Sequence, residues 1–236
     1  MERIRKALAE LNTECTDRML EQFQVYMDGV LEWNEKLNLT AITDRDEFIE
    51  KHFVDSLMAV DSDEVRKAES VIDVGTGAGF PGIPLAIVFP EKKFVLMDSL
   101  NKRLKVIDDL CERAGIMNVV TAHGRAEELS RNKLHREKYD LCIARAVANM
   151  STLSEYCLPF IGIGGYFLAY KGPDCEEELN EAKNAIKILG GKIEDVREAE
   201  ISDFGLSHKI VYVKKIKETP AKYPRKAGTP SKDPLK

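Results

Sequence analysis

The sequence predicts an α/β fold, in which a Rossmann-like sheet of seven mostly parallel strands follows a set of helices. Three observations carry this prediction. From residue 70 onward, short apolar runs alternate with helical stretches. One of these runs leads directly into a glycine-rich turn that opens a helix. The last two runs are separated by only a short link, so we expect them to form an antiparallel hairpin at one edge.

The apolar runs are short and bounded by polar residues, as strands of a buried sheet are. They cover residues 71–74, 94–97, 119–122, 139–144, 166–170, 193–196 and 210–213. The clearest helical stretches between them are 101–114, 151–159 and 174–189. Alternation of this kind indicates βαβ units and therefore a parallel sheet with helices on its faces.

Different patterns flank this central part. After Thr16-Asp17, a plausible helix cap, apolar residues recur at helical spacing, and a second helical pattern surrounds Phe53. The chain beyond Lys217 carries four prolines and no periodicity, so it is an extended arm that becomes ordered only by packing on something. We therefore expect a helical extension over 1–65, a ligand-binding domain over 66–217 and a C-terminal arm over 218–236.

The composition bounds the class of protein. Hydrophobic residues make up 44% of the chain, and no segment has the ~18 uninterrupted apolar residues of a membrane span. The charged N-terminus shows no signal peptide. Five cysteines and four histidines have no metal-ligand spacing. We expect a cytoplasmic protein with reduced thiols, without a metal, and with a monomer as the favoured state.

Charge is distributed unevenly along the chain. Residues 214–236 hold eight basic and two acidic side chains, a net charge of +6, which leaves −11 for the preceding residues within a total of −5. Such asymmetry is typical of a basic arm on an acidic domain. A solvated tail without a partner explains the charge equally well.

The strongest local signal is the glycine-rich turn after the first strand. Glycines here allow positive φ angles and let a ligand approach the backbone. Gly77-x-Gly79-x-x-Gly82 with Asp98 downstream matches the dinucleotide fingerprint, so NAD is a serious competitor. Asp73, two residues before Gly75, can brace the loop or reach the amino group of an amino-acid ligand, which weighs against NAD. The closing hairpin and the lack of a proton-relay motif also disfavour hydride transfer.

The glycine-rich turn is one of several motifs that stand in a fixed order along the chain. They are Trp33-Asn34-x-x-x-Asn38-Leu39-Thr40, Lys51-His52-Phe53-x-Asp55-Ser56, Asp73-Val74-Gly75-x-Gly77-x-Gly79-Phe80-Pro81-Gly82, Asp98-Ser99-Leu100-x-Lys102-Arg103, Gly124-Arg125-Ala126-Glu127-Glu128, Ala144-Arg145-Ala146-Val147 and Lys222-Tyr223-Pro224-Arg225-Lys226-x-Gly228-Thr229-Pro230. With these motifs the chain resembles, nearly from end to end, the ribosomal RNA small subunit methyltransferase G family, also called glucose-inhibited division protein B.

The resemblance implies a class I methyltransferase fold, S-adenosylmethionine as cofactor, and methylation of N7 of one guanine in 16S ribosomal RNA, with small-subunit RNA or the 30S subunit as partner. It implies that Asp98 binds the cofactor ribose and that Ala126 and Glu127 meet its adenine. The cofactor-binding residues implied are Gly75, Gly77, Gly79, Phe80, Asp98, Ser99, Ala126, Glu127 and Arg145.

Guanine N7 carries a lone pair, so no general base is required, and alignment supplies the catalysis. Arg145 is then a positioning residue for cofactor or RNA. Each candidate also has a structural interpretation: Asp98 as a helix cap, Glu127 as a solvated acid and Arg145 as an ion-pair partner. His52 and Asp55 form either a functional or a packing pair, and Lys171 either contacts phosphate or lies in an exposed turn. An NAD-dependent oxidoreductase and a non-catalytic cofactor sensor in cell division stay open as alternative functions.

Overall fold

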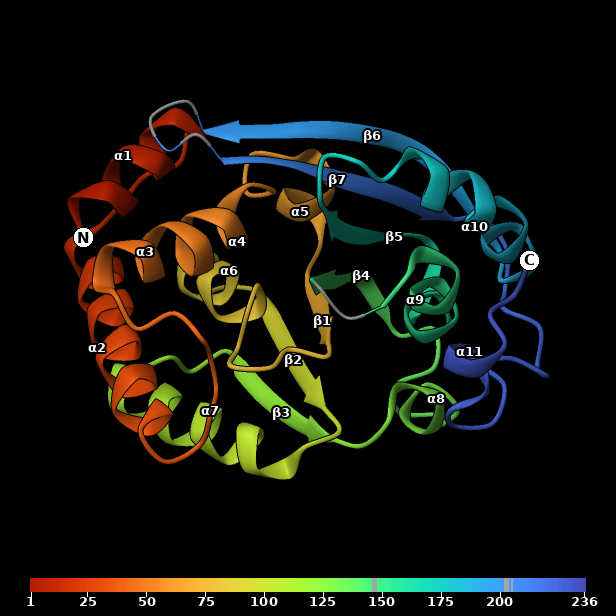
Figure 1. Cartoon of the computed structure of the whole chain (residues 1–236), viewed down its shortest axis with the longest axis horizontal. Helices are drawn as coiled ribbons and strands as arrows, with labels where there is room; N and C mark the ends of the chain where they lie inside the picture. The colour runs from red at the N-terminus through yellow and green to blue at the C-terminus, as the bar shows by residue number, and fades with distance from the viewer. Residues whose placement is uncertain (146–147, 202–203, 205) are drawn as a thin grey trace.

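A seven-stranded sheet forms the centre of the protein (Figure 1). The structure is a computed structural model that describes residues 1–145, 148–201, 204 and 206–236. The strand order is β3-β2-β1-β4-β5-β7-β6. The strands are β1 (Ser70–Val74), β2 (Lys93–Asp98), β3 (Val119–His123), β4 (Tyr139–Arg145), β5 (Ile161–Lys171), β6 (Gly191–Ile201) and β7 (Leu206–Lys215).

The pairing of the strands confirms the predicted sheet. Strands β1 to β5 pair in parallel, whereas β7 pairs antiparallel with both β5 and β6. The two last strands thus form a hairpin at one edge. Strands β5, β6 and β7 extend further than their apolar runs, because glycines and polar residues at their ends interrupt the apolar pattern.

Helices cover both faces of the sheet, and the two faces have separate hydrophobic cores. The first half of the chain covers one face, and α8 to α11 lie on the other (Figure 1). The helices on the first face are α1 (Glu2–Glu10), α2 (Asp17–Asn34), α3 (Arg45–Phe48), a π-helical turn (Ile49–Val54), α4 (Asp55–Leu57), α5 (Asp63–Lys67), α6 (Gly82–Val88) and α7 (Asn101–Ala114). Those on the second are α8 (Ala126–Leu129), α9 (Met150–Cys157) and its 3-10 extension (Leu158–Phe160), α10 (Glu176–Ile188) and α11 (Thr229–Lys232).

The helix predicted after Thr16-Asp17 is present as α2. The Thr16 side chain accepts a hydrogen bond from the Met19 amide at 3.2 Å and so caps α2. Asn34 is the last residue of α2, and its side chain accepts hydrogen bonds from the amides of Leu39 and Thr40 at 2.7 and 2.9 Å. These bonds fold the polar segment into a bend that turns the chain toward α3.

The predicted helix over 151–159 is divided in the structure. Helix α9 ends at Cys157 and a 3-10 turn continues to Phe160. The reason is Pro159, which has no amide hydrogen to donate to the preceding turn.

The C-terminal segment, residues 218–236, packs against the second face of the sheet, and we call it the C-terminal strap. Tyr223 is 7% exposed, so its ring packs on the protein and is not free to stack on a base. The strap passes α8 and α9 and includes α11 (Figure 1). The segment predicted to be an extended arm is therefore ordered by packing on the domain.

No helix within the part of the chain that the structure describes has the length and apolar character to cross a membrane.

Candidate active site

The first candidate site is a cleft of about 350 Å³ at the carboxyl ends of β1 and β2, the edge where open α/β sheets bind ligands. We call it the Asp98 cleft. Its walls come from the strand ends, the loop before α8, and α9. The lining residues are Val74, Gly75, Met97, Asp98, Ser99, Arg103, Gly124, Arg125, Ala126, Glu127 and Tyr156.

Asp98 ends β2 and ties the glycine turn to the sheet. Its Oδ2 accepts from the Gly77 amide at 3.1 Å, and its Oδ1 accepts from the Leu100 amide at 2.8 Å. The Arg103 guanidinium lies 3.5 Å from Oδ2. The second bond satisfies a backbone amide at the start of α7, so the capping interpretation of Asp98 holds alongside its place in the cleft.

The glycines of the turn have different surroundings. Gly77 has φ +61°, and a Cβ added there would meet no atom within 4 Å. Gly79 has φ +93°, and its Cβ would lie 2.4 Å from the Tyr26 hydroxyl oxygen. Gly77 therefore faces open space beside Asp98, whereas Gly79 allows α2 to pack closely on the turn.

Asp73 lies beneath the turn and is completely buried. Its Oδ2 accepts from the Thr76 hydroxyl at 2.7 Å and from the Gly82 amide at 2.9 Å. Its Oδ1 is the one buried side-chain oxygen or nitrogen without a partner among the described residues. Burial raises the pKa of Asp73 to about 7. Asp73 thus braces the turn, as expected, and retains one acceptor.

Glu127 is not a solvated acid. It is 4% exposed, and its Oε1 accepts from the Gly228 amide of the C-terminal strap at 2.8 Å. Helix α8 therefore places Ala126 and Glu127 in the wall of the Asp98 cleft, and the strap holds the carboxylate from the other side.

The second candidate site is a cleft of about 420 Å³ between β4, β5 and the N-terminal helices, which we call the Arg145 cleft. Arg145 donates to the Lys51 carbonyl at 3.1 Å and forms an ion pair with Asp55. The other oxygen of Asp55 bonds to His208 Nδ1. The lining residues are Lys51, His52, Asp55, Arg145, Tyr170, Lys171, Gly172 and His208.

The titratable groups of the Arg145 cleft already have partners. Burial and the charge of Arg145 lower the pKa of His52 to about 4, so its ring is neutral. Its Nδ1 faces Arg145 at 3.4 Å and its Nε2 lies 2.7 Å from the Thr40 hydroxyl, which assigns the proton to Nε2. Burial alone would raise the pKa of Asp55, but the bond from His208 and the charge of Arg145 hold it below its usual range.

The same hydrogen bond to Asp55 raises the pKa of His208. Lys171 is not in an exposed turn. Its ammonium pairs with Glu178 at 2.6 Å and donates to the Ala148 carbonyl at 3.0 Å. Arg145, Lys171 and His208 are therefore each held by a partner within the protein. The exposed Lys51 pairs with Glu47.

The structure places Phe80 beside Arg145 and away from the Asp98 cleft. Its ring stacks on His52 with centroids 4.5 Å apart and packs edge-on against Phe48. The Arg145 guanidinium lies 5.5 Å above the Phe80 ring. The sequence grouped Phe80 with the glycines because they share one loop, but the aromatic side chains of the N-terminal helices draw its ring to the other side.

The predicted site residues thus divide between the two clefts. Gly75, Asp98, Ser99, Ala126 and Glu127 line the Asp98 cleft, and Gly77 is bonded to Asp98. Gly79, Phe80 and Arg145 do not line it. The two residues after Arg145 in its motif, 146 and 147, lie outside the described residues.

Sequence reasoning missed part of both linings. Arg103 belongs to the motif that begins at Asp98 and Arg125 to the motif that begins at Gly124, so these two motifs were the signal that could have found them. No sequence signal pointed to Tyr156 or His208, because helix α9 and strand β7 reach the clefts only through the tertiary fold.

Comparisons with known proteins identify the family of the chain. A family model described as rRNA small subunit methyltransferase G matches residues 19–204. The chain is 52% identical to a protein of Clostridium novyi named ribosomal RNA small subunit methyltransferase G, over 97% of this chain and 94% of that protein. It is 48% identical to a protein of the same name from Alkaliphilus metalliredigens, over 96% of this chain and 95% of that protein.

Solved structures of low sequence identity share the fold. The Methanococcus jannaschii TYW2 structure in complex with AdoMet has a TM-score of 0.54 at 19% identity, covering 75% of this chain and 80% of that one. A putative O-methyltransferase from Klebsiella pneumoniae has a TM-score of 0.53 at 13% identity, covering 81% and 90%.

The sheet with its antiparallel hairpin is thus the class I methyltransferase fold. The matches support neither the oxidoreductase nor the non-catalytic alternative. The chain belongs to the ribosomal RNA small subunit methyltransferase G family, and it is an S-adenosylmethionine-dependent methyltransferase.

Proposed function

We propose that this enzyme methylates N7 of a specific guanine in 16S ribosomal RNA. In this proposal the Asp98 cleft binds S-adenosylmethionine and the Arg145 cleft receives the target nucleotide. The glycine turn joins the two, since Gly75 lines the first and the ring of Phe80 packs on His52 at the second.

The residues of the Asp98 cleft fit the cofactor. Asp98, at a strand end, has the carboxylate that would hold ribose hydroxyls, and the backbone at Ala126 and Glu127 would border the adenine. Gly77 offers open space at the turn. The unpaired oxygen of Asp73 supplies a further acceptor below the turn, which suits a ligand with an ammonium group. When bound, S-adenosylmethionine supplies a methyl group on a sulfonium centre.

The observation that carries the choice of N7 is the state of the Arg145 cleft. Both oxygens of Asp55 are bonded, both ring nitrogens of His52 have partners, and the Tyr170 hydroxyl donates to the Ser56 carbonyl at 2.9 Å. None of these three side chains is free to take a proton. The bond to Asp55 raises the pKa of His208, the other imidazole of the cleft, which favours its protonated form, and that form cannot accept a proton. An acceptor atom that already has a lone pair and no proton, as N7 of guanine does, needs no such base.

Arg145 then acts by position. Asp55 and the Lys51 carbonyl hold its Nη1, which fixes the guanidinium plane above Phe80. A planar, fixed guanidinium can hold a phosphate of the target nucleotide in two bonds and so leave N7 free to attack. Alignment of the nucleophile is the main source of acceleration in such a transfer.

The RNA would also contact exposed lysines near the C-terminus. Lys217, Lys222, Lys226, Lys232 and Lys236 are exposed, whereas Arg225 pairs with Glu155 and Lys215 is buried. We propose that these lysines and the N-terminal helices bind phosphates of small-subunit RNA, naked or within the 30S subunit, in the cytoplasm, with the enzyme acting as a monomer. Such binding weakens steeply with salt.

The test is the identity of the product. Purified enzyme, labelled S-adenosylmethionine and small subunits from a strain that lacks the gene should give labelled 16S RNA. Digestion should yield the label in 7-methylguanine. A label in any other base would refute the N7 assignment, and unlabelled small-subunit RNA would refute the substrate.

A further inference from the structure

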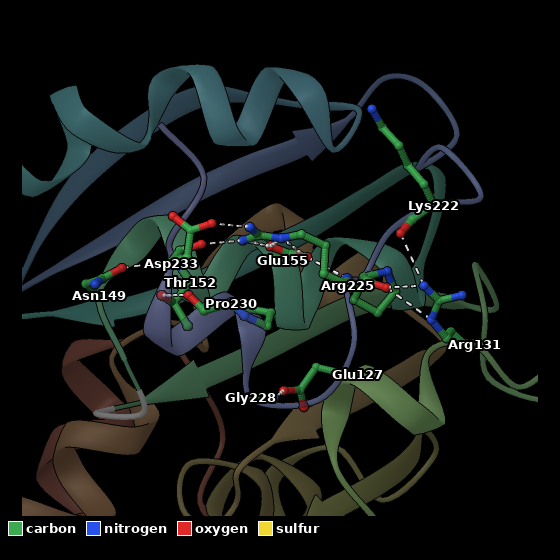
Figure 2. A network of polar contacts seen from close by, with 11 residues as sticks. Glu127, Arg131, Asn149, Thr152, Glu155, Lys222, Arg225, Gly228, Pro230 and Asp233 are labelled. Carbon is green, nitrogen blue, oxygen red and sulfur yellow. Dashed lines mark hydrogen bonds and ion pairs between the residues drawn. The ribbon is translucent and has the colours of Figure 1, made fainter.

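The C-terminal strap is held to the domain mainly through its backbone. Arg131, just after α8, donates to the carbonyls of Lys222 at 3.1 Å and of Pro224. Arg136 donates to the carbonyls of Tyr223 at 3.0 Å and Thr219 at 2.7 Å. Figure 2 shows how the strap lies along α9 with Arg131 at one end of the contact. Because these bonds are made to backbone carbonyls, they hold the backbone of the strap in place and not merely one of its side chains.

Arg225 is the most strongly bound side chain of the strap. Its Nε lies 3.1 Å from both carboxylate oxygens of Glu155, its Nη2 lies 2.8 Å from Oε2, and its own amide donates to Oε1 at 2.6 Å. Glu155 is on α9 and is completely buried. A buried carboxylate needs such a partner, so the strap and α9 are held as a unit.

The strap also reaches both sides of the Asp98 cleft. The Gly228 amide donates to Glu127, which lines the cleft from α8 (Figure 2). Glu155, bound by Arg225, immediately precedes Tyr156, which lines the cleft from α9. The Thr152 hydroxyl of α9 donates to the Pro230 carbonyl at 2.9 Å. Two separate walls of the cleft thus have their position set by one segment.

We infer that the C-terminal strap positions the cofactor cleft, with Arg225 and Gly228 as positioning residues that act through Glu155 and Glu127. This inference rests on the proposed assignment of the Asp98 cleft to S-adenosylmethionine. Neither residue lines the cleft. Their effect is to hold α8 and α9 at the separation that the cofactor requires. The strap therefore controls cofactor affinity even though it lies outside the site.

The experiment measures S-adenosylmethionine binding to the full chain by calorimetry, together with KM and kcat for methyl transfer. Arg225→Gln should raise the Kd about tenfold, because the carboxylate left without its partner draws α9 from its place. Arg225→Lys keeps the charge without the fork and should recover part of the affinity. Lys226→Gln is the matched control, since it removes the same charge from the exposed neighbouring residue and should leave the Kd unchanged.

Gly228→Ala provides a second variant in case Arg225→Gln does not fold. Its added Cβ meets no atom within 4 Å, but φ of +82° disfavours alanine and should move the amide away from Glu127. We expect a severalfold higher Kd and KM for the cofactor, with kcat at saturating cofactor little changed. A purely structural role would lower the melting temperature without this split between KM and kcat.

Unchanged Kd values in the folded variants, or an equal loss in Lys226→Gln, would overturn the inference while wild-type binding stands. A wild-type protein that does not bind S-adenosylmethionine would overturn the assignment of the cleft and the inference with it.

Discussion

The two clefts at the carboxyl edge of the sheet are built in different ways. The Asp98 cleft is formed by strand ends, a glycine turn and backbone amides, and its central carboxylate bonds to the amides of Gly77 and Leu100. The Arg145 cleft is formed by charged side chains from three distant segments, which meet at Asp55. The first depends on backbone geometry, the second on a network of side chains.

This difference indicates how each cleft responds to change. Backbone amides and glycines keep their positions whatever the pH, but they admit no extra atoms near the ligand. A side-chain network depends instead on the charge and the hydrogen-bonding geometry of each of its members. Under the proposed assignment, substitutions in the Asp98 cleft should change cofactor affinity, and substitutions in the Arg145 cleft should change the rate of transfer.

The largest expected effect comes from the glycine turn. Gly77→Leu places a side chain in open space beside Asp98, so it should lower the affinity for S-adenosylmethionine by more than about 10²-fold, beyond the ~3 kcal/mol of one lost hydrogen bond. Calorimetry measures this directly. Gly79→Ala is the contrast, because its Cβ would clash with Tyr26 and should reduce thermal stability. An unchanged Kd in Gly77→Leu would remove the turn from the cofactor site.

Arg145→Lys tests the second cleft. Lysine keeps the charge toward Asp55 but cannot offer a planar fork, so we expect a loss of about 10²-fold in the rate of transfer. The Kd for S-adenosylmethionine should stay the same, since Arg145 does not line the Asp98 cleft. Single-turnover transfer of labelled methyl to small subunits measures the rate. A fully active variant would assign Arg145 to an ion pair of structural value alone.

Asp98→Ala should have a smaller effect on cofactor affinity than Gly77→Leu. It removes a charge-assisted hydrogen bond, a loss of roughly 1.5–3 kcal/mol in binding free energy. Glu128→Ala is the control, because Glu128 is exposed and its substitution removes the same charge near the cleft. Equal losses in the two variants would show a general electrostatic effect, contrary to the specific role of Asp98.

The smallest effect concerns pH and the network around Asp55. Bonding to Asp55 raises the pKa of His208 above its usual value of 6.5. The stabilisation is therefore complete below pH 6.5 and disappears as pH rises through the higher, folded-state pKa. His208→Gln should lower the free energy of unfolding at pH 6, by on the order of 1 kcal/mol after solvent screening, and less at pH 9.

Urea unfolding at the two pH values measures this difference. His135→Gln is the control, because burial lowers the pKa of His135 and its charge cannot add stability at pH 6. A loss in His208→Gln that is equal at both pH values would show that packing, and not the ion pair, is what His208 contributes.

The sequence by itself determined the sheet, the glycine turn and the place of Asp98, because each is encoded over a short distance. A strand followed by glycines and a helix can form only one kind of turn, and a carboxylate at the end of the next parallel strand must lie beside it. The residues that line the Asp98 cleft accordingly include five of those expected from the sequence.

The tertiary structure alone decided what Arg145, Phe80 and the C-terminal segment do. Arg145 and Asp55 are 90 residues apart, and His208 and Asp55 are 153 apart. From its sequence the strap is likewise a basic arm, whereas in the structure Arg225 pairs with Glu155, 70 residues away. Which charges meet across such distances depends on how the N-terminal helices, β4 and β7 pack together, and no local pattern records that packing.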